Sequence, residues 1–293
     1  MHVKALSALL EAPRHGFVDL PRESSESTLC FIIDPVRQPD AMSRLYRVGE
    51  PVVDAQGLFL KTAFAEIAAD GPLWITAPWG SRLAAEAAKL CEENFSGIAI
   101  TTADSDKALA HARWLLRAND GSGGQSLLSY HKPSLWAALA YTVGDNSHQL
   151  FGPWKHVYSP APVHFGRNKG SWLSWRAASE VEWLGDTSVF SLPPSAANVQ
   201  EHLGWVYWAD EHHADYGEPS DEHLPNLVAN LNVLVAHNIY EGRHLLKLGS
   251  ITNGPLLETQ PQAMAILQSR EESFIKVQQL QQLTTSVADE PVR

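Results

Sequence analysis

In the first half of the chain, continuous apolar runs alternate with segments whose apolar residues recur every three or four positions. The runs predict strands and the periodic segments predict helices. Runs of apolar and β-branched residues predict strands over 29–33, 73–76, 98–101, 126–130 and 154–158. Apolar residues three or four positions apart predict helices over 41–47, 62–69, 82–94, 133–141 and from 105 to the glycine turn at 121–124. This alternation is typical of an α/β (α+β) lobe with a mixed sheet, which we place over residues 28–160.

Residue types at the predicted helix starts support these boundaries. Asp40, Ser81 and either Asp104 or Ser105 precede helices, where a side-chain oxygen can accept a hydrogen bond from an unpaired backbone N–H. Pro133 occupies a first helical position, where its missing N–H costs no hydrogen bond. We therefore expect helices to begin at these residues.

The pattern changes after Pro160. Residues 161–195 mix glycine, proline and tryptophan without a regular period, which predicts an irregular connection that packs across a domain boundary. The remainder, 196–293, shows helical periods over 199–210, 224–248 and 261–283 and no convincing strand. An all-α C-terminal lobe is expected there.

Two polar stretches carry no helical or strand period. The segment 1–27 ends in PRESSEST, and we expect it to form a leader or an exposed loop. The last ten residues, TTSVADEPVR, are expected to be disordered.

Several short motifs stand in a characteristic order within residues 28–160. They are Asp34 after the first strand, Gly71-Pro72-Leu73-Trp74-Ile75, Gly97-Ile98, Asp104-Ser105, His111 with Arg113, Gly121–Gly124, Tyr130-His131-Lys132-Pro133 and Gly152-Pro153. This order resembles the effector adaptor or chaperone proteins of bacterial type VI secretion, a family built on a domain of unknown function. The family usually has an arginine in the strand before Pro133 and an aspartate directly before that proline. This chain has Ser129 and Lys132 there instead.

The resemblance implies a cytoplasmic adaptor without enzymatic activity. Such proteins recognise a specific toxic effector, help to load it onto the spike protein of the secretion apparatus, and remain behind in the cell. By the same analogy, residues 28–160 are the shared scaffold, and the helical lobe 196–293 is where effector contacts are expected first.

Composition narrows the range of partners. The 33 acidic and 22 basic residues give a formal charge of −11, which opposes attraction to nucleic acid or to an anionic membrane. No run approaches the roughly 20 apolar residues that cross a bilayer, and the first 16 residues lack the apolar region of a signal peptide. Cys30 and Cys91 are too few for a disulfide framework, so we expect buried free thiols in a reducing cytoplasm. We expect no cofactor.

One cluster of histidine and acidic residues supports an alternative hypothesis. Asp210-Glu211-His212-His213 and Asp215 lie between His202 and His223, and His212 and Asp215 have the i, i+3 spacing that places two ligands on one helix face. The alternative is a metal-dependent or acid/base hydrolase that uses the His202–His223 region. Against it, the cluster lacks a His-Glu-x-x-His motif and has the composition of a solvated helix end, so we expect no metal site.

Other catalytic signatures are missing from the sequence. It contains no Gly-x-Ser-x-Gly motif. The Gly121–Gly124 turn lies between a helix and a strand, the reverse of a phosphate-binding loop, and is predicted to be a hairpin-like connection. His111 lies on the apolar face of its helix, and we expect a buried, hydrogen-bonded histidine rather than a catalytic one. We therefore expect a protein that is not an enzyme.

Aromatic residues give the remaining functional hint, because the chain has ten tryptophans. Tryptophan is enriched at the centres of protein interfaces. Three aromatic residues fall within one turn of the first C-terminal helix, and they either contact a partner or fill the seam between the lobes. The last predicted helix offers an apolar stripe that either binds a partner helix or packs on its own domain. The candidate partner-binding residues are Trp205, Tyr207, Trp208, Met264, Leu267 and Phe274.

Overall fold

The computed structural model describes residues 2–15, 27–52, 54–119, 121, 123–165, 170–176, 188–217 and 219–288. The chain divides into two compact units. The sheet unit comprises Glu11–Ala161 and Asn168–Gly204, and the helical unit comprises Met1–Leu10, Pro162–Arg167 and Trp205–Arg293.

An antiparallel sheet forms the centre of the sheet unit. Among the described residues it has seven strands in the order β1, β9, β8, β5, β2, β4, β3, and every neighbouring pair is antiparallel. The strands are β1 (Arg14–His15), β9 (Trp172–Arg176), β8 (Trp154–Pro160), β5 (Gly97–Thr102), β2 (Thr28–Ile33), β4 (Leu73–Ala77) and β3 (Asp54–Gly57).

A second, smaller sheet is mixed. In the part of the chain that the structure describes, β10 (Phe190–Ser191) pairs in parallel with β6 (Arg117–Asn119), and β6 pairs antiparallel with β7 (Gln125–Leu127). With helices following in the C-terminal part, the α+β fold class is confirmed.

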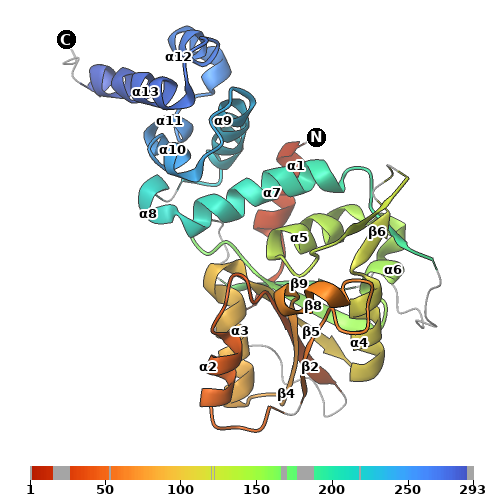
Figure 1. The fold of residues 1–293 in the computed structure, drawn as a ribbon. Coiled ribbons are helices and arrows are strands. Elements are labelled where there is room, and N and C mark those ends of the chain that lie inside the picture. Colours follow the sequence, from red (N-terminus) through yellow and green to blue (C-terminus); the bar gives the residue numbers. More distant parts are fainter. Residues whose placement is uncertain are drawn as a thin grey trace. The chain divides into compact units, whose positions relative to one another are not determined.

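Helices cover both faces of the large sheet (Figure 1). The helices α2 (Ala41–Arg47) and α3 (Arg82–Glu92) pack on one face. The other face carries α4 (Ser105–Trp114), α5 (Pro133–Thr142) and α6 (Ser147–Phe151). Strand β2 is buried by helices on both sides. Phe31 and Ile33 face α2 and α3, Cys30 and Ile32 face α4 and α5, and all four side chains are 0 % exposed. A strand buried on both faces has no polar side, which explains its continuous apolar run.

Helices begin at all four predicted places, and three of the four starts also show the expected local feature. The Ser81 hydroxyl accepts a hydrogen bond from the Ala84 N–H at 3.0 Å, and the Asp104 carboxylate accepts from two backbone N–H groups of α4. Pro133 is the first residue of α5. Asp40 precedes α2, but its side chain makes no capping hydrogen bond.

The predicted helix over 62–69 is wrong in type and extent. A 3₁₀ helix, η2 (Ala65–Asp70), stands there, with Ile67 outside helical geometry at φ −111°. The Thr62 hydroxyl donates to the Phe59 carbonyl at 2.6 Å and accepts from the Phe64 N–H at 3.1 Å. Such local side-chain bonds compete with an α-helical start.

Helix α4 also ends earlier than predicted, at Trp114. The Leu116 carbonyl accepts a hydrogen bond from the Leu128 N–H at 2.7 Å, and the chain then continues as the β6–β7 hairpin. The predicted strand 126–130 is therefore reduced to the short β7. The hairpin-like connection expected around 121–124 joins these two strands.

Three segments expected to be irregular contain regular structure. Within 1–27, residues His2–Glu11 form α1 and Arg14–His15 form β1, while 16–26 lie outside the described residues. Within 161–195, β9 joins the large sheet beside β8 and β10 joins the small one. Within the last ten residues, α13 (Ser273–Ala288) continues to 288, and 289–293 lie outside the described residues.

The described C-terminal part contains helices and no strand after β10. Helix α7 (Ala196–Glu211) spans the division between the units, and α8 (His213–Tyr216) follows it.

Each of the two long helices predicted in this part is divided into two in the structure. The segment 224–248 contains α9 (Leu224–Ala236) and α10 (Gly242–Leu246), because Asn238 adopts φ +68° and Glu241 is extended. The remaining elements are α11 (Gly249–Thr252), η5 (Leu257–Thr259), α12 (Pro261–Leu267) and α13, so the helix predicted over 261–283 is two helices.

Two buried polar side chains fix the turns between these helices. Asn230 on α9 is 0 % exposed, and its amide donates to the carbonyls of Thr252 and Pro255 at 3.1 and 3.2 Å and accepts from the Leu257 N–H at 2.8 Å. The Lys276 ammonium of α13 donates to the Leu267 carbonyl at 2.8 Å, at the C-terminal end of α12. A cation there is favoured by the helix dipole.

Candidate partner-binding surface

The six candidate partner-binding residues all belong to the helical unit, where they form two separate groups. Trp205 and Trp208 lie on α7 with ring centroids 5.7 Å apart and nearly perpendicular at 86°. The Trp205 indole N–H donates to the Asn232 side chain of α9 at 2.6 Å. Trp208 also stacks edge-on against Tyr216, at 5.3 Å. Both tryptophans are half-buried and packed on their own unit.

The other four residues differ in exposure. Tyr207 is 4 % exposed and Leu267 is 0 % exposed, so both are part of the core. Met264 is half-buried. Phe274, in the first turn of α13, is 59 % exposed. Of the six, Phe274 is the side chain that a partner can reach without rearrangement.

Sequence reasoning missed other exposed apolar residues of the helical unit. Tyr240 in the α9–α10 connection is 67 % exposed, and Val163 and Val235 are 50 % and 37 % exposed. The hydrophobic period selects core-facing positions, so an apolar residue that points into solvent gives no signal of its own.

The four histidines of the His202–His223 region do not converge on one site. His202, His212 and His213 each place Nδ1 within hydrogen-bond distance of a carbonyl three or four residues earlier, at 2.6, 2.8 and 3.1 Å. His223 pairs with the Ser220 hydroxyl at 2.8 Å. Such contacts are typical of histidines on helix surfaces.

One contact of this region involves a residue that sequence analysis did not select. The imidazoles of His164 and His213 are stacked, with centroids 3.4 Å apart, beside the buried carboxylate of Asp210. Asp210 accepts a hydrogen bond from the backbone N–H of His164 at 2.8 Å, and the His164 Nδ1 lies 3.3 Å from the same oxygen. Among the described residues, no three histidine, cysteine, aspartate or glutamate side chains are placed to hold a metal ion.

The motif residues of the sheet unit hold the fold together. A Cβ at Gly97 would lie 2.3 Å from the Ile32 carbonyl oxygen and 2.7 Å from the Cys91 sulfur, so only glycine lets β5 approach β2 and α3. Gly152 adopts φ +50°, and a Cβ there would lie 2.6 Å from the His111 ring. Both glycines are required by close packing.

His111 fills the space beside Gly152. It is 0 % exposed, donates from Nε2 to the Leu150 carbonyl at 3.0 Å, and packs against Trp114 and Trp154. Burial lowers the pKa of His111 to about 4, although the bond to Leu150 raises it. The expected buried, hydrogen-bonded histidine is confirmed.

A second buried histidine lies beside the aspartate that ends β2. His131 and Asp34 are 5 % and 8 % exposed, and the His131 Nε2 lies 3.7 Å from the Asp34 carboxylate. Burial raises the pKa of Asp34, but hydrogen bonds from His131 and from backbone N–H groups outweigh it and hold the pKa below its usual value. Burial lowers the pKa of His131 against the opposing effect of Asp34.

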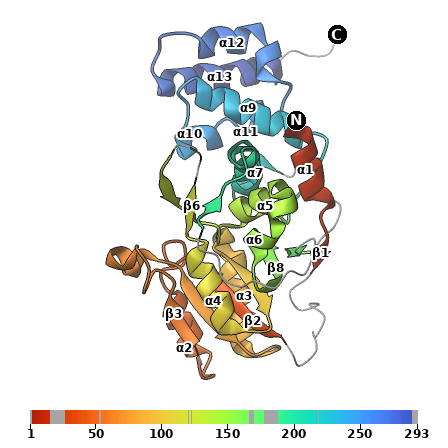
Figure 2. The ribbon, with the colours of Figure 1, turned by 90° about the vertical axis from the view of Figure 1, so that its right-hand side faces the viewer.

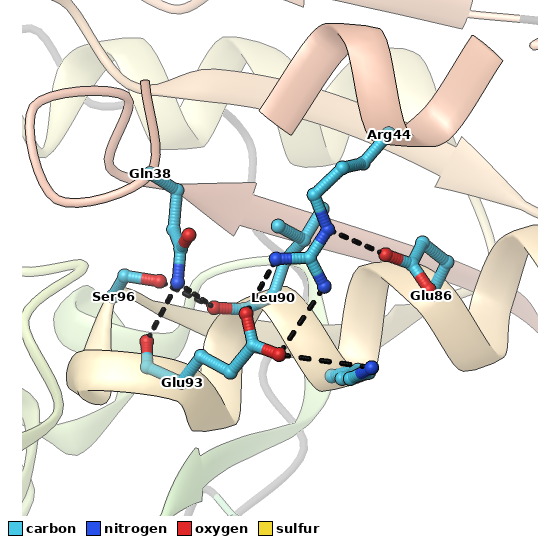
Figure 3. Close-up of polar contacts among 7 residues, drawn as sticks. Gln38, Arg44, Glu86, Leu90, Glu93 and Ser96 are labelled. Carbon is cyan, nitrogen blue, oxygen red and sulfur yellow. Dashed lines mark hydrogen bonds and ion pairs between the residues drawn. The ribbon is translucent and has the colours of Figure 1, made fainter. Parts of the chain in front are cut away.

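A polar network attaches α2 to the end of α3 (Figure 3). Arg44 binds the carboxylates of Glu86 and Glu93 at 2.7 and 2.5 Å, and its hydrogen bond lowers the pKa of Glu93. The Gln38 amide donates to the carbonyls of Leu90 and Glu93 at 3.2 and 3.0 Å. The polar groups of these side chains bond to one another and to the backbone, which is typical of a network that stabilises the fold.

The two cysteines are buried free thiols, as predicted. Burial raises the pKa of Cys30 to about 12 and the pKa of Cys91 well above its usual value. Since the thiolate is the reactive form, neither sulfur has the character of a nucleophile at neutral pH.

Comparison with known proteins gives one match. The model of a family described as "Domain of unknown function (DUF4123)" matches residues 30–150, less than half of the chain. No curated protein and no solved structure matches. The described residues include no helix that is long and apolar enough to cross a membrane.

Proposed function

We propose that this chain is a cytoplasmic, non-enzymatic adaptor that binds a type VI secretion effector and helps to load it onto the spike protein. The observation that carries the proposal is the family match over residues 30–150. That range coincides with the segment whose motifs resemble the secretion adaptors. The alternative hydrolase receives no support, because its histidines are separately bonded to nearby groups.

An adaptor needs rigid structure and accessible contact residues, and both are available here. The sheet unit is braced by the glycine contacts, His111 and the Arg44 network. In the helical unit, Phe274 combines an apolar side chain with 59 % exposure. Exposed aromatic side chains supply much of the binding energy where a partner desolvates them.

The test uses the tagged full-length chain, purified from the bacterium that carries it while the secretion genes are expressed. Mass spectrometry should identify one toxin-like effector and a spike protein, and purified components should reassemble. We expect Phe274→Asp to weaken effector binding by about tenfold or more. Tyr240→Asp, at an exposed aromatic residue outside the candidate set, is the matched control.

Two results would count against the proposal. A chain that recovers neither an effector nor a spike protein under these conditions is not an adaptor of this kind. If Phe274→Asp and Tyr240→Asp both bind as the wild type does, Phe274 is not a contact residue. Leu267→Glu is unsuitable as a test, because Leu267 is 0 % exposed and a buried charge would unfold the unit.

A further inference from the structure

Strand β3 forms one outer edge of the large sheet. Strand β3, which is labelled in Figure 2, is the last strand in the sheet order. Strand β4 pairs with it on its inner side. In the part of the chain that the structure describes, no strand pairs with its outer side. An unpaired strand edge presents backbone N–H and C=O groups that another extended chain can bind.

Natural proteins usually protect such edges, and β3 lacks two of the usual protections. Its sequence, Asp54-Ala55-Gln56-Gly57, contains no proline and no lysine. The opposite edge of the sheet, β1, is only two residues long. Strand β3 is also attached to a rigid template, because its neighbour β4 contains Trp74 and Ile75, both 0 % exposed.

The segment that follows β3 carries exposed apolar side chains and returns to the end of this strand. The position of a Cβ at Gly57 would be 3.5 Å from the Leu60 side chain and 3.7 Å from the Ala68 carbonyl, so η2 and its preceding turn meet the end of β3. Leu60 is 44 % exposed and Ile67 is 47 % exposed. Their neighbours Ala63, Ala65 and Ala69 are also exposed.

The charges around this edge indicate the partner's sign. Glu66 and Asp70 are exposed on η2, and Asp54 begins β3. Within residues 54–70 the cation is Lys61, which is exposed. Arg113 of α4 also contacts this segment, because its guanidinium is bonded to Gln56 at 2.8 Å and to the Leu58 carbonyl at 3.4 Å. Carboxylates are in excess, in a chain of formal charge −11, so a basic side chain on the partner is favoured.

We infer that the β3 edge, with Leu60 and Ile67, binds an extended segment of the effector that adds a strand to the sheet. The segment should carry alternate apolar side chains, which cover Leu60 and Ile67, and a lysine or arginine near Glu66 or Asp70. Backbone pairing supplies affinity in this binding mode, and the alternate side chains supply specificity. This inference rests on the proposed adaptor function and assigns one of its two partners to the sheet unit.

The small sheet provides a matched control. Strand β7 is also an edge strand, and its Leu127 is 39 % exposed. However, β7 is three residues long, and its sheet has only two other strands among the described residues.

The experiment measures binding of the purified effector and of the purified spike protein to full-length variants. We expect Leu60→Asp and Ile67→Asp each to weaken effector binding by about tenfold or more, while Leu127→Asp binds as the wild type. Spike binding should be unchanged in all three. Hydrogen exchange should show that effector binding protects the backbone amides of 54–57, which side-chain contact alone would not do.

The outcomes separate this inference from the proposed function. If the effector binds but the β3 amides gain no protection, or if Leu60→Asp and Ile67→Asp bind normally, the adaptor function stands and the β3 inference is wrong. If these variants lose the spike protein instead of the effector, the assignment of the partner is wrong. If the wild-type chain binds neither protein, the function and the inference both fail.

Discussion

Acid should destabilise the sheet unit through His111, and the size of the effect can be calculated. Burial holds the pKa of His111 at about 4, against 6.5 for an ordinary histidine. The unfolded chain therefore binds a proton between these two values and the folded chain does not. By linkage, stability from this group is complete above pH 6.5 and is lost as the pH falls toward 4. A difference of about 2.5 pKa units corresponds to about 3 kcal/mol, of which roughly 2 kcal/mol is lost between pH 7 and 4.5.

The described contacts of His111 are with uncharged groups. Its ring contacts Trp114, Trp154 and Gly152, and its one described hydrogen bond acceptor is the Leu150 carbonyl. The variant His111→Gln keeps an N–H donor toward Leu150 and removes the titrating ring. It should be less stable than the wild type at pH 7, because amide and imidazole differ in shape, but its stability should depend less on pH.

The assay is denaturant unfolding at pH 7 and 4.5, with hydrogen exchange of α4 and β5 to report on the sheet unit alone. The wild type should lose roughly 2 kcal/mol more than His111→Gln between these pH values. His131, whose pKa is also lowered, titrates in the same direction in both proteins and cancels in this comparison. Equal losses in the two proteins would refute the reasoning, since His111 would then not be the group that resists protonation.

Two further substitutions test the packing and the helix turns. Gly152→Ala should destabilise the sheet unit by about 3 kcal/mol or more in thermal unfolding, because Gly152 has φ +50° and a Cβ there would lie 2.6 Å from His111. The control is Gly57→Ala, which should change stability little, because a Cβ at Gly57 would meet only contacts of 3.5 Å and longer. Similar losses for both glycines would contradict this reasoning. Asn230→Asp removes the two N–H donors to buried carbonyls and should lower the stability of the helical unit by roughly 3 kcal/mol. Part of this loss should be recovered at low pH, where the new carboxyl group is protonated. The control, Asn232→Asp, keeps the acceptor for the Trp205 indole and should lower the stability much less. A helical unit whose exchange protection is unchanged in Asn230→Asp would show that this amide does not fix the α11–η5 turn.

Much of the sheet unit could be predicted from the sequence because its strands are buried on both faces. The run from Leu29 to Ile33 is continuously apolar, and the small residues Ala84, Ala87 and Ala88 mark the close packing of α3. Ser81 and Asp104 mark helix starts by local chemistry, which needs no tertiary information. Such elements are defined within a few residues of the sequence.

The elements that were missed depend on distant partners or on single backbone angles. Strand β9 is recognisable as a strand only through its pairing with β8, and β1 only through its pairing with β9. The division between α9 and α10 depends on Asn238 at φ +68°, in a stretch whose composition is otherwise helical. The contact between His164 and His213 joins residues 49 positions apart, so no local pattern could have indicated it.

The residues that carry the family resemblance have structural explanations, and this limits what the family match can predict. Gly97 and Gly152 are required by close contacts, and His111 and Asp34 are buried. A match at these four positions supports a shared scaffold and does not specify a partner, because each of them is buried or closely packed. Partner choice must reside in exposed residues, whose identity the fold does not dictate. Leu60, Ile67 and Phe274 are exposed and satisfy that condition. Under the proposed adaptor function, exchanging these residues for those of another member of the matched family should therefore change the effector bound without changing the fold.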